Sequence, residues 1–313
     1  MTKKEKAKLS QIERIEKYKN SFVLFKPIAR LTKLTKEDRQ LLKKQKQDRA
    51  KELVTVKKDF NMKKNAFEIR NWNVWFGSRH ALIDVTTDIE KNKVTAVIGT
   101  NASGKTVLLR SLNRMNHIVS RNVSTSGNIY FYNGTNLYSP KIPQVELTTR
   151  VGLISQKPTP FPMSIYDNVA YGPKNHGITN KAVINKIVRE ALDDAALWDE
   201  VKDKLSAPAS SLSGGQQQQL CIARAIALQP EVLLMDQPTT GLDPIATTFI
   251  ENLILQLKQK FTIVMVTHSM NQAQRVSDNT LFMWKGQLLE QGSTRDIYTN
   301  PKHKRTKDYI LGR

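Results

Sequence analysis

The spacing of apolar and polar positions changes near residue 66, and from there it predicts strands that alternate with helices. Residues 66–75 and 81–89 alternate in part between apolar and polar, which is typical of strands. Residues 94–98 form a short apolar run that ends at Gly99, the pattern of a strand buried on both faces, as in a parallel sheet. Further strands are predicted at 127–132, 151–155, 232–235 and 262–266.

Helical periodicity begins near Lys105 and returns in two longer stretches. Residues 180–198 place their apolar side chains on one face, and 216–228 form a second helical stretch that Pro230 closes. The region around 160–215 has little strand signal and predicts a helical insert. Strands that alternate with helices indicate an α/β domain.

Composition places the chain among folded proteins without disulfides. Apolar residues make up 39% of the 313 residues, which excludes a wholly disordered chain. Cys221 is the single cysteine, so no disulfide can form within the chain and a reducing compartment is expected. The apolar runs are far shorter than the roughly 20 residues of a membrane-spanning helix, and the lysine-rich N-terminus has no apolar core like that of a secretory signal. We therefore expect an intracellular protein whose association with a membrane, if any, is peripheral.

Positive charge is concentrated near the N-terminus. The formal net charge is +21, and residues 1–65 contain 21 Lys and Arg against 8 Asp and Glu. Such a segment attracts anionic lipid or nucleic acid, or it is a solvated arm with no specific partner. Residues 35–56 have the composition of a helix. We expect 1–65 to be a basic, partly helical or disordered extension, and 66–313 to be the folded domain.

The strongest chemical signal is a glycine-containing octapeptide between a predicted strand and a predicted helix. Residues 99–106 match GxxxxGK[ST] in full. In this pattern, glycines let successive backbone N–H groups turn toward phosphate oxygens, and the start of the helix adds partial positive charge. Lys105 would reach the β- and γ-phosphates, and the Thr106 hydroxyl would bind Mg²⁺. The phosphate-binding candidates are Gly99, Thr100, Asn101, Ala102, Ser103, Gly104, Lys105, Thr106 and Val107.

A carboxylate follows the apolar run 232–235. A parallel strand carries Asp236 to the carboxyl edge of the sheet, where the phosphate-binding loop also lies. A strand that ends in Asp is common, but here the upstream loop gives the carboxylate a role, because Mg²⁺ prefers oxygen ligands and needs a second anchor beside Thr106. The two motifs together predict a site for ATP and Mg²⁺.

Residues 212–216 read Leu-Ser-Gly-Gly-Gln and directly precede a predicted helix. Because this pentapeptide is highly specific, the chain resembles the ATP-binding-cassette (ABC) ATPases over about 66–300. The resemblance implies an α/β P-loop NTPase fold of the ABC type, with an N-terminal antiparallel β subdomain and a helical subdomain that carries the signature. It also implies that ATP contacts Ser213, Gly214, Gly215 and Gln216.

Other landmarks of that family follow in the expected order. Gln156 matches the glutamine that senses Mg²⁺ and the membrane partner, which makes it a candidate for ATP and for the metal. Asp243 matches the loop that crosses the dimer interface, and His268 matches the switch histidine that contacts the γ-phosphate. Phe76 matches the aromatic residue that stacks on adenine, with Trp75 as an alternative because stacking tolerates either ring.

The resemblance also implies how the motifs cooperate. In the family, two cassettes pack head to tail, and each ATP lies between the phosphate-binding loop of one chain and the signature of the other. Ser213 and the N–H groups of Gly214 and Gly215 would cover the γ-phosphate from the far side. ATP then stabilises a symmetric interface, and its hydrolysis opens that interface and drives a membrane partner. We therefore expect a homodimer of cassettes.

The stretch after the predicted strand 151–155 indicates one particular group within the ABC ATPases. Residues 156–173 are similar to the corresponding stretch of the phosphate-import ATPases, and so are 112–116, 220–227 and 267–273. That resemblance implies ATP-driven import of inorganic phosphate with two transmembrane permease subunits and an extracytoplasmic phosphate-binding protein. It places the chain peripherally on the cytoplasmic side of the cell membrane, with no specific nucleic acid. No residue of this chain can be assigned to phosphate as cargo.

Three positions depart from the family pattern. Gln237 follows Asp236 where the family has a glutamate that polarises the attacking water, and an amide can position water but cannot accept its proton. A substitution that traps the ATP-bound dimer, natural loss of fast turnover, and compensation by another group all stay open; we expect slow turnover with intact ATP binding. Val107 replaces a hydroxyl residue and Gln219 a basic one. The catalytic candidates are Lys105, Gln237 and His268.

Other functions stay open at this point. A cassette ATPase that acts on ribosomes or DNA would suit the basic extension, although such proteins usually carry two cassettes or a long coiled-coil insert. An importer of another solute, such as an amino acid or a phosphonate, would share every motif described above. A regulatory cassette that does not hydrolyse ATP would explain Gln237.

Overall fold

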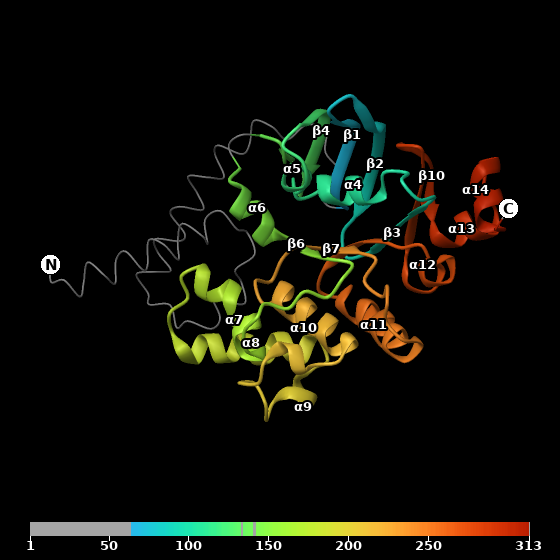
Figure 1. Cartoon of the computed structure of the whole chain (residues 1–313). Coiled ribbons are helices and arrows are strands. Elements are labelled where there is room, and N and C mark those ends of the chain that lie inside the picture. The colour runs from blue at the N-terminus through green and yellow to red at the C-terminus, as the bar shows by residue number, and fades with distance from the viewer. Residues whose placement is uncertain (1–63, 133, 140–141, 313) are drawn as a thin grey trace, which may run out of the picture.

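The computed structural model describes residues 64–132, 134–139 and 142–312. Two β-sheets lie one above the other, and most helices pack beneath the larger sheet (Figure 1). The predicted extension 1–65 and its helix fall outside the described residues, apart from Lys64 and Asn65. Asn65 begins the first strand, one residue before the predicted start of the nucleotide-binding domain.

The smaller sheet is antiparallel, which confirms the predicted β subdomain. Its strands run in the order β2-β1-β4-β5. The turn between the first two strands contains Gly77 with φ +59, the left-handed backbone that a tight hairpin needs. The strands are β1 (Asn65–Phe76), β2 (Arg79–Glu90), β4 (Val123–Phe131) and β5 (Thr135–Asn136).

The larger sheet is parallel except at one edge. Its order is β10-β9-β3-β8-β7-β6, and β10 alone pairs antiparallel with its neighbour. The β9–β10 hairpin lies beyond the elements that the sequence pattern assigned, although Lys285 (φ +46) and Gly286 (φ +85) have the backbone of a tight hairpin turn. The strands are β3 (Val94–Gly99), β6 (Val151–Ile154), β7 (Val232–Asp236), β8 (Thr262–Val266), β9 (Asn279–Trp284) and β10 (Gln287–Ser293).

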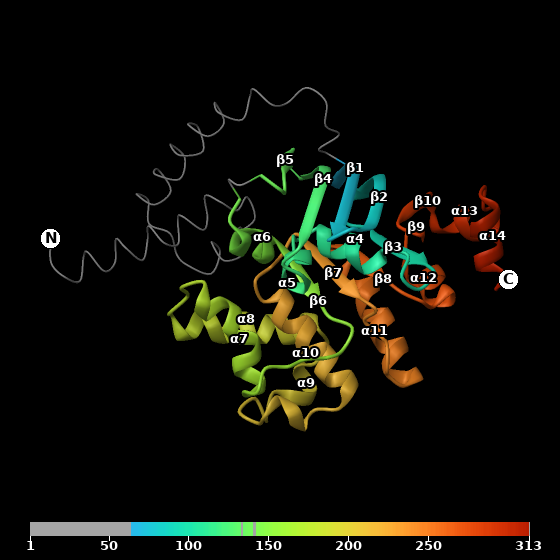
Figure 2. The ribbon, with the colours of Figure 1, turned by 45° about the horizontal axis from the view of Figure 1, so that its top comes forward.

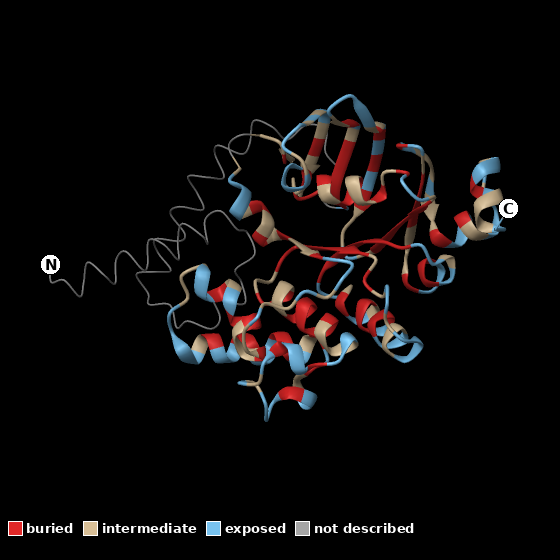
Figure 3. Cartoon of the chain, viewed as in Figure 1, coloured by how far each residue is buried: buried red, intermediate tan, exposed pale blue. Residues whose placement is uncertain are grey.

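The central strands are buried on both faces, as their apolar runs predicted (Figure 3). Successive side chains point to opposite faces, so Val97, Leu234 and Val264 join the core beneath the antiparallel sheet, while Leu233 and Met265 join the core with the lower helices. Helix α4 (Lys105–Ser111) lies between the two sheets (Figure 2) and buries Leu108 and Leu109 in the upper core. This packing fixes the start of α4 at the end of β3.

A helical insert forms where the sequence predicted one. The predicted helix 180–198 ends at Asp194, because Ala196 adopts φ +51 and the buried Gln219 amide donates to the Ala195 and Ala196 carbonyls (3.1 and 3.0 Å). The residue that departs from the family pattern thus closes a helix. The insert comprises α7 (Ile165–Asn175), α8 (Lys181–Asp194), α9 (Trp198–Val201), a short 3-10 turn (Ala209–Ser211) and the start of α10 (Gly214–Ile226).

The remaining helices flank the sheets. Within the part of the chain that the structure describes, none of the helices has the length and apolar character required to cross a bilayer. These helices are α5 (Asn116–Val119), α6 (Gln144–Arg150), α11 (Pro244–Leu257), α12 (Met270–Val276), α13 (Thr294–Thr299) and α14 (Lys304–Ile310).

Candidate nucleotide-binding site

The loop between β3 and α4 has a backbone that requires glycine. A Cβ atom on Gly99, which has φ +143, would lie 2.0 Å from the Met283 carbonyl oxygen. A Cβ atom on Gly104, with φ +100, would lie 2.7 Å from the Leu82 side chain. Both glycines of the GxxxxGK[ST] pattern are therefore fixed by close packing as well as by backbone conformation. The loop is held from the β9–β10 turn, where the Gly286 N–H donates to the Ser103 carbonyl (3.0 Å).

Lys105 is turned into this loop. Its Nζ donates to the carbonyl oxygens of Gly99 (2.9 Å) and Thr100 (2.7 Å), and the residue is only 5% exposed. Burial lowers the pKa of Lys105 to about 8, and the Asp236 carboxylate partly opposes that shift. The hydroxyl of Ser103 is also buried there without a hydrogen-bond partner among the described residues. A buried cation and a spare hydroxyl in a loop that leads into a helix N-terminus fit the oxygens of a phosphate chain.

Thr106 and Asp236 meet at the carboxyl edge of the sheet. The Thr106 hydroxyl donates to Asp236 Oδ1 (3.0 Å), and Arg110 lies 3.6 Å from the other carboxylate oxygen. A hydroxyl and a carboxylate are the ligand types that Mg²⁺ prefers, so these residues fit the predicted metal. Arg110 was not predicted; its signal is that it follows Thr106 by four residues and so shares a helix face with it.

A cavity of about 310 Å³ brings together residues that lie far apart in the sequence. It is lined by Phe76, Arg79, Ala81, residues 101–107, Gln237 and His268. The alternative aromatic, Trp75, instead stacks on His80, with ring centroids 4.4 Å apart. Arg79, three residues after Phe76 on the adjoining strand, is a cationic member of the lining that the sequence analysis missed.

Gln237 is held in place at this cavity by both its backbone and its side chain. It has φ +53, and its N–H donates to the Val266 carbonyl (2.9 Å). Its Oε1 accepts hydrogen bonds from Gln156 Nε2 (3.2 Å) and from the Thr240 hydroxyl (3.3 Å). Gln156 is therefore joined to the site through Gln237. The side chain can orient a neighbouring group, but it has no basic atom that would take up a proton.

His268 follows β8 and reaches the same cavity. Partial burial lowers its pKa, the nearby Lys105 ammonium lowers it further, and Asp236 opposes both effects. The imidazole is therefore neutral at pH 7, with one ring nitrogen that donates and one that accepts.

The signature residues lie elsewhere in the chain. Ser213 caps α10: its hydroxyl accepts from the Gln216 N–H (3.3 Å), and the Gln216 side chain accepts from the Ser213 N–H (3.0 Å). The Asp243 carboxylate caps α11 by accepting a hydrogen bond from the Ala246 N–H (2.9 Å). The structure does not bring Ser213, Gly214, Gly215, Gln216 or Asp243 to the cavity that the phosphate-binding loop lines.

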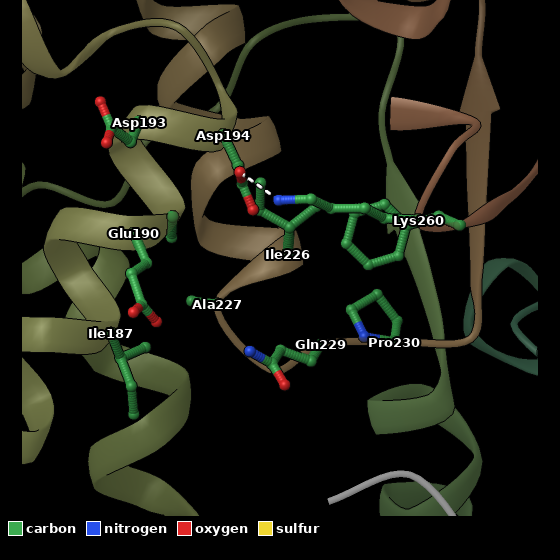
Figure 4. A pocket seen from close by; sticks show the side chains of 11 residues that line it. Ile187, Glu190, Asp193, Asp194, Ile226, Ala227, Gln229, Pro230 and Lys260 are labelled. Carbon is green, nitrogen blue, oxygen red and sulfur yellow. Dashed lines mark hydrogen bonds and ion pairs between the residues drawn. The ribbon is translucent and has the colours of Figure 1, made fainter. Parts of the chain in front are cut away.

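A larger hollow of about 540 Å³ lies between α8, the end of α10 and the segment that leads into β8 (Figure 4). Its wall carries Glu190, Asp193 and Asp194, and Lys260 pairs with Asp194 at 2.5 Å. None of the predicted site residues lines it, and the described residues contain no group of three or more His, Cys, Asp or Glu side chains that could hold a metal ion. The larger volume of this hollow therefore does not identify it as the nucleotide-binding site.

The two-sheet fold, the phosphate-binding loop beside Asp236 and the capped signature helix define an ATPase of the ATP-binding-cassette class. A family model described as ABC transporter matches residues 82–240. A phosphate import ATP-binding protein PstB of Mycoplasmoides gallisepticum is 56% identical over 83% of this chain and 80% of its own length. The PstB protein of Thermotoga maritima is 51% identical over 79% of this chain and 97% of its own length. The chain belongs to the family of phosphate import ATP-binding proteins within the ABC transporter ATPases.

Solved structures agree with the fold. The cbiO1 protein of Clostridium perfringens, part of the ABC transporter complex cbiONQ, superposes with a TM-score of 0.67 at 27% identity, covering 80% of this chain and 96% of that one. A bacterial Atm1-family ABC exporter with ATP bound gives a TM-score of 0.66 at 22% identity, covering 83% of this chain and 43% of that one. Both similarities confirm the predicted ABC-type nucleotide-binding fold.

We predict that nucleotide affinity falls as the pH rises above about 8. In the nucleotide-free chain Lys105 loses its proton near that pH, and phosphate binding requires the ammonium, so binding must then take up a proton. The dissociation constant for MgATP should rise by about 10-fold or more between pH 7 and pH 9.5, as measured by calorimetry in buffers of different ionisation enthalpy.

Lys105→Arg provides the control for this titration. A guanidinium stays protonated over the whole range, so the variant should bind nucleotide with a dissociation constant that does not change with pH. Equal affinities of the unaltered chain at the two pH values would contradict the prediction.

Proposed function

We propose that this chain is the subunit of a phosphate importer that binds and hydrolyses ATP to drive a membrane permease. The observation that carries the proposal is the single cavity formed by the phosphate-binding loop, Gln237 and His268. It occurs in a chain that is 51–56% identical to phosphate import ATP-binding proteins over about four fifths of its length. The cargo is inferred from those relatives, since no residue described here is placed to recognise a transported phosphate ion.

The proposed roles follow from the positions of the side chains. Phe76 stacks on the adenine, the backbone of 99–107 surrounds the phosphates, and Lys105 exchanges its two carbonyl partners for phosphate oxygens. Thr106, Asp236 and Gln156 would hold Mg²⁺, which neutralises charge on the phosphate chain when it is bound. His268, held neutral, donates a hydrogen bond toward the γ-phosphate.

The other half of the site comes from a second copy. Ser213 and Asp243 are exposed and lie outside the cavity of their own chain, and the start of α10 directs backbone N–H groups outward from Gly214 and Gly215. A head-to-tail homodimer would bring these groups to the γ-phosphate of the neighbouring chain. Two permease subunits and an extracytoplasmic phosphate-binding protein complete the proposed transporter, with this chain peripheral on the cytoplasmic face.

Vesicles that contain the permease subunits, with this chain and MgATP enclosed and the phosphate-binding protein outside, test the function. We expect ATP-dependent uptake of radiolabelled phosphate that excess phosphonate or amino acid does not reduce. Ser213→Ala should lower that uptake by about 10-fold or more, because it removes a hydrogen bond to the reacting phosphate. The matched variant Ser211→Ala should leave uptake unchanged, because its hydroxyl donates to the Pro208 carbonyl of its own chain. Uptake of another solute in place of phosphate would contradict the proposed cargo.

We also propose that Gln237 keeps hydrolysis slow while ATP binding stays intact. Gln237→Glu should raise the single-turnover rate of ATP hydrolysis by about 10²–10⁴-fold, because a carboxylate accepts the proton of the attacking water and an amide does not. Gln256→Glu adds the same charge to an exposed face of α11 and should leave the rate unchanged. Equal rates for the chain with Gln237 and the chain with Glu at that position would reject this role.

We propose that residues 1–65 form an extension separate from the nucleotide-binding domain of 66–313. This extension would recruit the chain to anionic membrane. The support is their excess of 21 Lys and Arg over 8 Asp and Glu. Deleting residues 1–63, which leaves β1 whole, should reduce co-sedimentation with phosphatidylserine vesicles at low salt and have little effect at high salt. Unchanged sedimentation at low salt would rule the role out.

A further inference from the structure

Two tyrosines of the C-terminal helices reach backbone carbonyls in the candidate nucleotide site. Helices α13 and α14 follow β10 and pack at its edge of the larger sheet (Figures 1 and 2). The Tyr309 hydroxyl in α14 donates to the Gly99 carbonyl (2.8 Å) at the start of the phosphate-binding loop. The Tyr298 hydroxyl in α13 donates to the Met270 carbonyl (2.9 Å), two residues after His268. Neither contact follows from any motif in the sequence.

The two helices are anchored firmly enough to hold these hydroxyl groups in place. At the start of α13, the buried Thr294 hydroxyl bonds to the hydroxyls of Thr280 (2.9 Å) and Ser277 (2.8 Å). Before α14, the N–H groups of Lys302 and His303 donate to the two carboxylate oxygens of Glu290 on β10 (2.7 and 3.1 Å). The helices that contain the two tyrosines are therefore attached to the larger sheet, at whose edge the candidate site lies.

Tyr309 shares its acceptor with Lys105. The Gly99 carbonyl accepts from the Lys105 ammonium as well as from the Tyr309 hydroxyl. When Lys105 turns to a phosphate, this buried carbonyl keeps the tyrosine as a partner. A buried carbonyl without a hydrogen bond would raise the free energy of the state in which Lys105 binds phosphate. Tyr309 thus lowers the free-energy cost of releasing Lys105 from the loop.

Tyr298 supports a different segment, the one that follows His268. Met270 is the first residue of α12, whose cap, Ser269, directly follows His268. Holding the Met270 carbonyl fixes the first turn of α12 and with it the segment that presents the imidazole. Burial raises the pKa of both phenols, so each stays a hydrogen-bond donor throughout the neutral range.

We propose that the C-terminal helices position the nucleotide site, with Tyr309 supporting the phosphate-binding loop and Tyr298 supporting the segment of His268. Both are positioning residues, and the inference rests on the proposed ATP site. Because the two tyrosines support different segments, their loss should affect ATP and ADP differently. The loop that Tyr309 supports would contact the phosphates common to ATP and ADP, whereas His268 would contact the γ-phosphate alone.

Tyrosine-to-phenylalanine variants of the full chain test the proposal, because each removes the hydroxyl and keeps the ring. The Tyr309 ring packs on Phe282 with centroids 5.1 Å apart, and that contact survives in Tyr309→Phe. Calorimetric titration with MgATP and MgADP should give dissociation constants about 5- to 30-fold higher for both nucleotides in Tyr309→Phe. Tyr298→Phe should weaken MgATP by about 3- to 10-fold and leave MgADP within 2-fold, which lowers the preference for ATP.

Tyr166→Phe is the matched control. It removes a hydroxyl that donates to Asn185 Oδ1 (2.7 Å) in the helical insert, away from both loops, and should leave both dissociation constants unchanged. The proposal is overturned if Tyr309→Phe binds both nucleotides like the unaltered chain, or if Tyr298→Phe weakens ATP and ADP equally. If the unaltered chain binds neither nucleotide, the proposed function fails together with this inference.

Discussion

The parallel pairing of β3, β8 and β7 is the constraint on which the rest of the site depends. In this register Val97 lies beside Val266, and Val266 lies beside Asp236, so all three strands end at the same edge. A different chemical group lies at the end of each strand: the phosphate-binding loop after β3, the carboxylate at the end of β7 and the imidazole after β8. The phosphate-binding loop and His268, more than a hundred residues apart in sequence, thereby line one cavity, and Asp236 is joined to it through its hydrogen bond with Thr106. The buried cores on either side of the sheet keep that edge rigid.

Lys105 shows how the phosphate-binding loop tolerates a buried cation. An unpaired ammonium in this environment would be costly, and the carbonyls of Gly99 and Thr100 offset that cost as neutral partners. Because neutral carbonyls compete weakly with a phosphate, the lysine stays available to a polyanion. The Tyr309 hydroxyl can donate to the Gly99 carbonyl both when Lys105 is bound to the loop and when it has turned to a phosphate.

Gln237 is a neutral side chain at the edge of the sheet where the phosphate-binding loop and His268 also lie. The amide takes part in the hydrogen bonds that join Gln156 and Thr240 to the end of β7, so the geometry of the site does not require a carboxylate there. Proton transfer from water does require a base. In the role proposed above, the site would bind ATP and hydrolyse it slowly, because Gln237 offers no basic atom to the attacking water.

The sequence by itself determined the phosphate-binding loop, the Asp236 strand, the helical insert and the ABC class, because those features depend on local spacing and on short motifs. It did not reveal Arg79, Arg110 or the two tyrosines. Nor did it reveal that Gln219 ends α8, because that bond joins residues more than twenty positions apart. Such contacts depend on which segments the folded sheets and helices bring together, and no local pattern of residues encodes that. The resemblance already implied that the signature and the phosphate-binding loop act across two chains. Only the tertiary structure decided which side chains line the cavity within one chain, because the pairing of strands far apart in sequence brings them together.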